Sequence, residues 1–349
     1  MYLTDCKRQY TYMGTLNFSI DYKADAGRYD GRMPYRKCGN SGLKLPELSL
    51  GFWWNFGGIN PLEESREKIL YAFDHGITCF DLANNYGPPF GTAEQTFGRV
   101  YKDNLRPYRN EMIVTTKAGY NMWEGPYGCG SSRKMLMASI DDSLRRMGLD
   151  YVDIFYSHRY DPETPIDETM QALVDIVRQG KALYVGISRY PVDKLLYAKK
   201  YLQDNNVPCL IYQGKYNMLD RGVEQNILHT VSSSGIGFTA FCPIAQGILT
   251  DKYLNGVPAD SRIGQGHYLT KNDIAGDVLC KVAALNAVAL RRGQTLAQMA
   301  TAWLLAREEV TSVIIGPRTM PQLIDSLGAV ANTSFDNEEL KEIDKILEG

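Results

Sequence analysis

Short apolar runs alternate with longer amphipathic stretches along most of this chain. The runs are bounded by Gly, Pro, Ser or Asn and have the length of buried β-strands. They predict eight strands, at Leu48–Trp53, Ile77–Ala83, Met112–Lys117, Tyr151–Ser157, Ala182–Ser188, Leu210–Tyr216, Gly237–Pro243 and Thr311–Gly316. The stretches between them have helical periodicity and predict helices, for example at Glu63–His75, Lys134–Met147, Asp167–Gln179 and Asp193–Gln203. This alternation predicts parallel strands joined by right-handed crossovers.

Eight such repeats favour an α/β fold whose strands close into a (β/α)8 TIM barrel. A doubly wound open sheet is the alternative. The repeat is irregular before the last strand, where the sequence predicts a loop at 246–275 and helices at 277–292 and 295–306. A further helix is predicted at 337–347. The C-terminal part therefore carries extra helices beyond the basic repeat.

The chain before the first core strand divides into two parts. Pro34–Pro46 predicts a two-stranded N-terminal β-hairpin that turns at Asn40–Gly42 and closes the N-terminal end of the barrel. Residues 1–33 are rich in Tyr, Asp and Gly and have no usable periodicity. We interpret them as an N-terminal extension that is disordered or lies over a partner. Because no linker interrupts the later pattern, we predict one domain at 34–349.

Composition and charge narrow the class of protein. Apolar residues make up 44% and charged residues 22% of the chain, which is typical of a soluble globular protein with a large core. The net charge of -2 gives no reason to expect nucleic acid or a membrane as partner, and no apolar run is long enough to cross a bilayer. Seven scattered cysteines without a CxxC pair or signal peptide predict reduced thiols and a cytoplasmic location. The four histidines lie far from one another and from any ligand-spaced cysteine, so no metal site is expected.

Polar side chains lie where consecutive predicted strands end. Asp81 lies near the end of the second strand with Tyr86 in the following loop, while Lys117 ends the third strand and His158 follows the fourth. Taken singly, each has an ordinary explanation: an aspartate bonded to loop amides, a snorkelling lysine, a histidine satisfied at the rim. In a barrel, however, the C-terminal strand ends meet at the face that carries active sites. The sequence therefore predicts that these four side chains form one site.

The four residue types together suit the protonation of a carbonyl oxygen. A free tyrosine titrates near ~10, and a neighbouring ammonium is expected to lower the pKa of Tyr86 toward the working range. Asp81 would pair with Lys117 and keep it charged in the barrel mouth. His158 would hydrogen-bond a substrate carbonyl and orient it while another group attacks the carbon.

The sequence around these residues strongly resembles that of the aldo-keto reductase superfamily. The segments that carry the resemblance are F-D-L-A-N-N-Y-G, V-T-T-K-A-G, Y-V-D-I-F-Y-S-H-R and G-K-A-L-Y-V-G-I-S. The similarity runs from about Pro34 to Leu347. It is closest to bacterial L-glyceraldehyde 3-phosphate/methylglyoxal reductases and to the related potassium-channel β subunits. The first group is favoured by the segment N-M-W-E-G-P-Y-G after the third strand. The resemblance implies that Asp81, Tyr86, Lys117 and His158 are the catalytic tetrad. It also implies NADPH as the hydride source for reducing a small reactive aldehyde or ketone, such as glyceraldehyde 3-phosphate or methylglyoxal.

The resemblance implies a cofactor site as well. Its nicotinamide side matches Ser188, Arg189 and Gln213, with Phe241 as the aromatic that stacks on the ring. The loop at 242–247 matches the one that surrounds the pyrophosphate with main-chain amides. The whole implied set is Trp53, Ser188, Arg189, Gln213, Phe241, Cys242, Pro243, Ile244, Ala245, Gln246, Gly247, Lys252, Arg262, Gly316, Arg318, Gln322, Asp325 and Ser326. Ser326 departs from the family pattern, which often has Asn there.

Two further sequence features and one other function compete with this interpretation. Gly235–Ala240 formally fits GxGxxA, but it leads into a strand instead of leaving one, which argues against a Rossmann fingerprint. Cys242 as a nucleophile has no histidine near it in sequence, so a buried structural thiol is favoured. A cofactor-binding regulatory protein like the channel β subunits is the alternative function, and His158 favours a working reductase.

The resemblance leaves the substrate and the assembly open. Relatives commonly assemble, so a homo-oligomer is one of the open alternatives. Aromatic side chains in the loops, from Trp53 to Tyr127, offer walls for an aldehyde pocket. Arg159 and Arg133 are candidates either for meeting a substrate phosphate or carboxylate or for rim salt bridges.

Overall fold

The computed structural model describes residues 22–266 and 268–348, and it confirms the closed barrel. Its parallel strands are hydrogen-bonded in the order β10-β3-β4-β5-β6-β7-β8-β9, and β9 pairs with β10 to close the ring. The open-sheet alternative is therefore wrong. The strands are β3 Leu48–Gly51, β4 Cys79–Asp81, β5 Ile113–Ala118, β6 Val152–Ser157, β7 Ala182–Ser188, β8 Cys209–Lys215, β9 Gly237–Phe241 and β10 Val310–Ile315.

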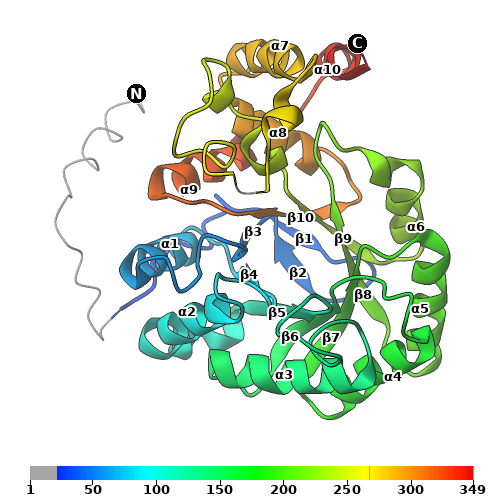
Figure 1. Ribbon diagram of the computed structural model, residues 1–349. Helices are drawn as coiled ribbons and strands as arrows, with labels where there is room; N and C mark the ends of the chain where they lie inside the picture. The colour runs from blue at the N-terminus through cyan, green and yellow to red at the C-terminus, as the bar shows by residue number, and fades with distance from the viewer. Residues whose placement is uncertain (1–21, 267, 349) are drawn as a thin grey trace.

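Helices surround the barrel, as Figure 1 shows. The outer helices are α1 Leu62–Asp74, α2 Thr92–Val100, α3 Arg133–Met147, α4 Ile166–Arg178, α5 Val192–Asp204, α6 Ile227–Ser233 and α8 Leu296–Leu305. The predicted extra helices are present as α7 Val278–Arg291 and α10 Asn337–Glu348, which contact each other at the top of the view, and α9 Met320–Leu327 follows β10. Short 3₁₀ or π turns lie at 101–105, 106–111, 222–225, 245–247, 251–253, 271–274 and 328–331. No helix within the described ranges is long and apolar enough to span a bilayer.

The predicted hairpin is confirmed and lies at the N-terminal end of the barrel. Strands β1 Tyr35–Lys37 and β2 Lys44–Pro46 are antiparallel, and the turn between them rests on the segment that enters β9. There the Asn40 amide donates to the Gly235 carbonyl over 2.9 Å. Gly39 has a φ of +53°, and a Cβ on it would lie 2.2 Å from the Gly235 carbonyl oxygen. The glycine-rich run at 235–240 therefore supports the hairpin and leads into β9.

The N-terminal extension is described only in its last part, because residues 1–21 lie outside the described ranges. From Tyr22 to Met33 the chain forms turns that contact the barrel itself. The Tyr22 hydroxyl donates to Asp74 at the end of α1 over 2.6 Å, and Arg28 pairs with Glu111 over 2.6 Å. This segment covers the barrel beside the N-terminal ends of β4 and β5.

The barrel interior presents a large ring directly below the predicted site. Tyr156 on β6 is fully buried, and its ring centroid lies 5.7 Å from the Lys117 ammonium on neighbouring β5. The ring fits because Gly186 on β7 has no side chain: a Cβ there would lie 2.5 Å from it. The lysine therefore stands on a packed floor at the C-terminal end of the strands.

Candidate active site

A buried ion pair joins the ends of β4 and β5. The Lys117 ammonium lies 2.7 Å from the Asp81 carboxylate, and the two side chains are 0% and 5% exposed. Lys117 also donates to the Leu82 carbonyl over 2.6 Å. The second carboxylate oxygen accepts from Thr115 over 2.8 Å and from Gln213 over 2.9 Å. Because its oxygens are fully engaged, Asp81 is fixed in position and holds the ammonium at the barrel mouth.

Tyr86 and His158 complete the group that the sequence predicted. The centroid of the Tyr86 ring lies 4.9 Å from the Lys117 ammonium and 5.8 Å from the centroid of the imidazole. The Tyr120 ring meets the same imidazole edge-on, at 4.6 Å between centroids. His158 is buried, and its Nδ1 has no hydrogen-bond partner among the residues that the structure describes. The structure thus brings all four side chains together, while their catalytic roles stay a prediction.

The protonation states differ in one respect from the sequence-based expectation. Burial, followed by the Asp81 carboxylate, raises the pKa of Tyr86 well above its usual value, so the expected lowering by Lys117 is wrong. Burial, followed by the charges of Lys117, Arg189 and Arg159, lowers the pKa of His158 well below its usual value. Burial also lowers the pKa of Lys117, and Asp81 opposes that shift. At neutral pH the site therefore holds a protonated phenol and an uncharged imidazole.

The predicted nicotinamide-side residues lie on strands next to this group. Ser188 ends β7, and its buried hydroxyl has no hydrogen-bond partner within the described residues. Arg189 follows with a φ of +57°, and its guanidinium donates to the Tyr120 hydroxyl over 2.9 Å. Gln213 on β8 binds Asp81, and Phe241 ends β9 half-buried. The unpartnered polar atoms of Ser188 and His158 fit a ligand that brings its own hydrogen-bonding groups, as a nicotinamide carboxamide and a substrate carbonyl do.

The predicted pyrophosphate loop is tightly bent. Cys242, Ala245, Gln246 and Gly247 all have positive φ, a backbone form found in anion-binding nests. Burial raises the pKa of the Cys242 thiol, which supports a structural role for it. Pro243 and Ile244 lie inside the bend, and Lys252 lies in the next 3₁₀ turn.

A loop crosses the mouth next to this bend and brings three predicted cofactor residues together. The Arg262 guanidinium donates to the Gln246 side chain over 3.0 Å and lies 5.0 Å from a Trp53 ring centroid. Tyr268 packs against both Trp53 and Trp54, at 5.1 and 5.0 Å between centroids. Trp53, Gln246 and Arg262 therefore form one contact chain across the mouth.

The predicted adenosine-side residues divide into two groups. Arg318, in the loop that follows Gly316, donates through its main-chain amide to Gln322 and through its guanidinium to the Asp260 carbonyl, each over 2.8 Å. Asp325, in contrast, accepts from Thr295 and Gln298 at the start of α8. The Ser326 hydroxyl donates to a carbonyl of its own helix, that of Gln322. Arg318 faces the crossing loop, whereas Asp325 and Ser326 are bound within the helical layer.

Two contributors were missed by sequence reasoning. Thr115 stands two residues before Lys117, so the period of a strand places both on one face; that signal was available. Lys68 in α1 is only 3% exposed and donates to the carbonyls of Asn55 and Arg318 over 3.2 and 3.0 Å. A lysine in an amphipathic helix gives no sign of this, because the two acceptors come from distant loops. Lys68 thus joins the loops after β3 and β10.

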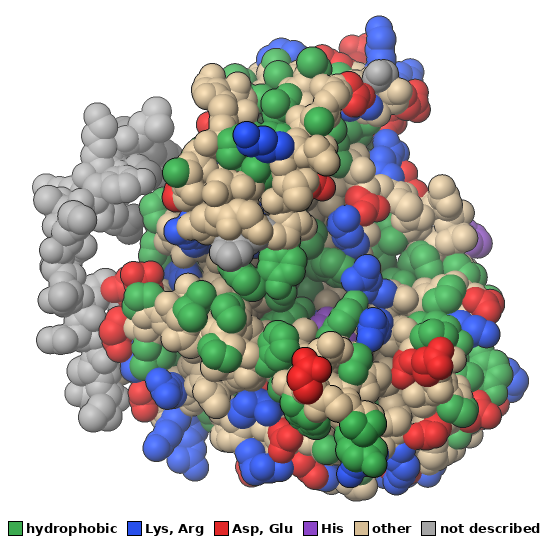
Figure 2. Space-filling model, in the orientation of Figure 1, with side chains coloured by type: hydrophobic (Ala, Val, Ile, Leu, Met, Phe, Trp, Pro, Cys, Tyr) green, Lys and Arg blue, Asp and Glu red, His purple; other side chains and the backbone are tan. Residues whose placement is uncertain are grey.

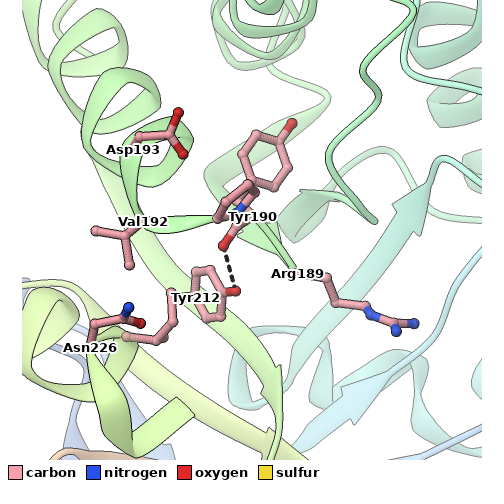
Figure 3. Close-up of a pocket in the computed structure, with 8 residues that line it drawn as sticks. Arg189, Tyr190, Val192, Asp193, Tyr212 and Asn226 are labelled. Carbon is pink, nitrogen blue, oxygen red and sulfur yellow. Dashed lines mark hydrogen bonds between the residues drawn. The ribbon is translucent and has the colours of Figure 1, made fainter. Parts of the chain in front are cut away.

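The mouth is hollowed and its rim is basic. Figure 2 shows a hollow lined by hydrophobic side chains, with a histidine at its floor and Lys and Arg side chains on one side. A separate depression of about 500 Å³ lies outside it, between Tyr190, Asp193 and Asn226. Figure 3 shows that Arg189 extends away from the other residues that line this depression, which agrees with its bond to Tyr120. Arg189 therefore belongs to the barrel mouth.

The barrel and the site together define the class of protein, an oxidoreductase of the aldo/keto reductase family. A model described as the aldo/keto reductase family matches residues 47–348, so the chain belongs to that family. The chain is 51% identical over 327 residues to the L-glyceraldehyde 3-phosphate reductase of Escherichia coli O157:H7, covering 92% of this chain and 94% of the relative. The same values hold for the protein of that name in strain K12. The chain is 36% identical over 303 residues to a probable voltage-gated potassium channel subunit beta of Arabidopsis thaliana, covering 85% of this chain and 91% of the relative.

Proposed function

We propose that the protein uses NADPH to reduce a small reactive aldehyde or ketone, such as glyceraldehyde 3-phosphate or methylglyoxal, to the alcohol. The observation that carries this proposal is the placement of Tyr86 between the Lys117 ammonium and the His158 imidazole. The similarity to a bacterial reductase of glyceraldehyde 3-phosphate supports the substrate class.

In this proposal Tyr86 is the general acid. Its raised pKa keeps the phenol protonated at neutral pH, so the proton is present when it is needed. As the proton passes to the carbonyl oxygen, the phenolate that forms is stabilised by the Lys117 ammonium. Asp81 keeps that lysine in place, and the uncharged His158 donates one N–H to the carbonyl and orients it. NADPH, when bound, supplies the hydride that attacks the carbonyl carbon.

The residues proposed to hold NADPH present a coherent set of groups. Ser188 would bind the carboxamide, the bent loop at 242–247 the pyrophosphate, and Trp53 and Arg262 would cover it. Arg318 supplies the cation for a 2′-phosphate, because a guanidinium binds phosphate through two parallel hydrogen bonds. Since NADH lacks this phosphate, Arg318 favours NADPH over NADH. Lys252, Gln322, Asp325 and Ser326 remain proposals at the edge of this site. We keep the cytoplasm as the proposed location, because the described cysteines are free thiols; the homo-oligomer stays a prediction.

Replacing the Tyr86 hydroxyl tests the proposal directly. Tyr86→Phe keeps the ring and its packing against Lys117 and His158, but it removes the proton. Positioned proton transfer contributes about 100- to 10,000-fold, so a loss of that order in kcat is expected for methylglyoxal reduction by NADPH. Lys117→Met should cost a similar factor, and the double variant little more, because both residues serve one proton transfer.

The matched control is NADPH binding, followed by fluorescence titration, which Tyr86→Phe should leave nearly unchanged. If Tyr86→Phe keeps most of its activity, another donor, His158 first, carries the proton and the assignment is wrong. A protein that binds NADPH but turns over no aldehyde would instead favour the regulatory role of a channel β subunit.

A further inference from the structure

Arg159 places a positive charge beside His158 that forms no ion pair with a carboxylate of the described residues. It follows His158 directly at the end of β6, and its Nε donates to the Gly119 carbonyl over 3.1 Å. One terminal nitrogen, Nη2, lies 3.2 Å from the Cys129 sulfur, and the guanidinium carbon lies 4.6 Å from the Tyr120 ring centroid. Within the described residues Arg159 forms no salt bridge, and no hydrogen bond is made by its other terminal nitrogen, Nη1. The guanidinium is thus held in place while part of its donor capacity is unused.

The carboxylate of Asp161, on which the charge of Arg159 acts, already has other hydrogen-bond partners. Asp161 is close enough for Arg159 to lower its pKa. One of its oxygens accepts from the Ser131 amide and the Thr164 hydroxyl, and the other accepts from the Glu163 amide. Asp161 therefore organises its own loop and leaves the guanidinium without a direct partner.

A second cation, the guanidinium of Arg189, contacts the Tyr120 ring at its hydroxyl. Arg189 donates to the Tyr120 hydroxyl over 2.9 Å, so Tyr120 has a guanidinium against its face and another at its hydroxyl. The ring itself meets His158 edge-on at 4.6 Å between centroids. Of the three cations that act on His158, only Lys117 is paired with a carboxylate among the residues that the structure describes. The side of the mouth at Tyr120 therefore carries excess positive charge.

We propose that Arg159 determines substrate specificity by binding a phosphate on the same small aldehyde whose carbonyl lies at Tyr86 and His158. This inference rests on the proposed function and narrows its substrate class to phosphorylated aldehydes. A guanidinium binds phosphate through two parallel hydrogen bonds, and one already fixed by Gly119 and Tyr120 loses little freedom on binding. Arg133, the other arginine considered, pairs with Asp175 between α3 and α4 and takes no part.

The test compares two aldehydes that differ only in the phosphate. Values of kcat/KM with NADPH are measured for glyceraldehyde 3-phosphate and glyceraldehyde in the wild type, Arg159→Met, Arg159→Lys and the matched control Arg133→Met. Charged hydrogen bonds contribute about 10- to 100-fold, and Arg159→Met should lose that factor for the phosphorylated aldehyde only. Arg159→Lys should fall between, because it keeps the charge without the fork, and Arg133→Met should match the wild type.

A binding measurement without turnover accompanies the kinetics. Glycerol 3-phosphate, which has no carbonyl, is titrated by calorimetry into the protein saturated with NADP⁺, and its Kd should rise in Arg159→Met by a factor like that in kcat/KM. The Kd for NADPH should not change.

Two outcomes would overturn the inference and leave the reductase assignment standing. Equal losses for both aldehydes would mean that Arg159 only holds the loop at 119–129. A weaker NADPH complex would mean that its charge serves the cofactor. If the wild type reduced neither aldehyde, the proposed function would fall, and the calorimetric titration would still decide whether Arg159 binds phosphate.

Discussion

The ion pair between Asp81 and Lys117 gives a quantitative prediction for the stability of the barrel. Asp81→Asn keeps the shape of the side chain and leaves an amide that can still meet Thr115 and Gln213. It replaces the carboxylate oxygen that faces the Lys117 ammonium at 2.7 Å with an amide NH2, so Lys117 loses both the opposite charge and a hydrogen-bond acceptor. Because Lys117 is 0% exposed, no water replaces the lost partner.

The size of the effect follows from burial. Removing one partner of a buried ion pair typically costs about 3–5 kcal/mol, because the other charge stays buried and unpaired. Burial already lowers the pKa of Lys117, and the loss of Asp81 lowers it further. In Asp81→Asn the lysine therefore releases its proton more easily than in the wild type, which limits the cost to about 3 kcal/mol. Lys117→Met, which leaves the carboxylate unpaired, should cost a similar amount.

The double variant separates a charge effect from a packing effect. Asp81→Asn with Lys117→Met contains no unpaired charge, so its loss should be about 2–3 kcal/mol smaller than the sum of the single losses. Urea denaturation at pH 7, followed by tryptophan fluorescence, measures the free energy of unfolding of the wild type, the two single variants and the double variant. Thr115→Val is the matched control: it removes a hydrogen bond to the same carboxylate and no charge, and should cost about 1 kcal/mol. Losses that add within about 0.5 kcal/mol would refute the reasoning, because the two charges would then act independently.

Two further predictions concern the loops that Lys68 joins. Arg318→Ala should raise the KM for NADPH well above any change for NADH, whereas Asp260→Asn should lower the KM for NADPH, because the Asp260 carboxylate lies 3.6 Å from the Arg318 guanidinium. Equal KM values for NADPH and NADH in the wild type would contradict both expectations. Burial lowers the pKa of Lys68 from 10.5 to about 8, so between these pH values the unfolded chain holds a proton that the folded chain has released. The free energy of unfolding of the wild type, relative to Lys68→Met, should therefore rise by about 3 kcal/mol from pH 8 to 10.5. If the difference in the free energy of unfolding between the wild type and Lys68→Met stays constant in urea titrations from pH 8 to 10.5, the prediction for Lys68 is wrong.

The barrel was predictable because its strands are buried on both sides. A strand inside a ring of helices must be apolar along its length, so the runs stand out, and β7 begins and ends where the sequence placed it. Helices α2, α6 and α9 were given no bounds from the sequence. Helix α6 has only seven residues and ends in serines, and α9 has a proline in its first turn. Such short segments have weak intrinsic preference and form because tertiary packing supports them.

The site was predictable as far as topology alone determines it. Parallel neighbours bring Asp81, Lys117 and His158 to one face whatever the loops do. The hydrogen bonds of Asp325 were not predictable, because its partners Thr295 and Gln298 belong to the segment that begins another helix. The sequence does not show that an acid in α9 accepts hydrogen bonds from the two capping side chains of α8.

The pKa of Tyr86 shows why a list of neighbours does not determine electrostatics. A lysine beside a tyrosine predicts an acidified phenol, but this lysine is paired with Asp81, whose carboxylate itself raises the pKa of Tyr86. Burial is the largest cause of the raised pKa of Tyr86, and the Asp81 carboxylate adds to it. The ammonium can stabilise a phenolate only once the phenol has given up its proton to the substrate. Lys117 would therefore act on the transition state more than on the resting enzyme, which is where an interaction accelerates a reaction.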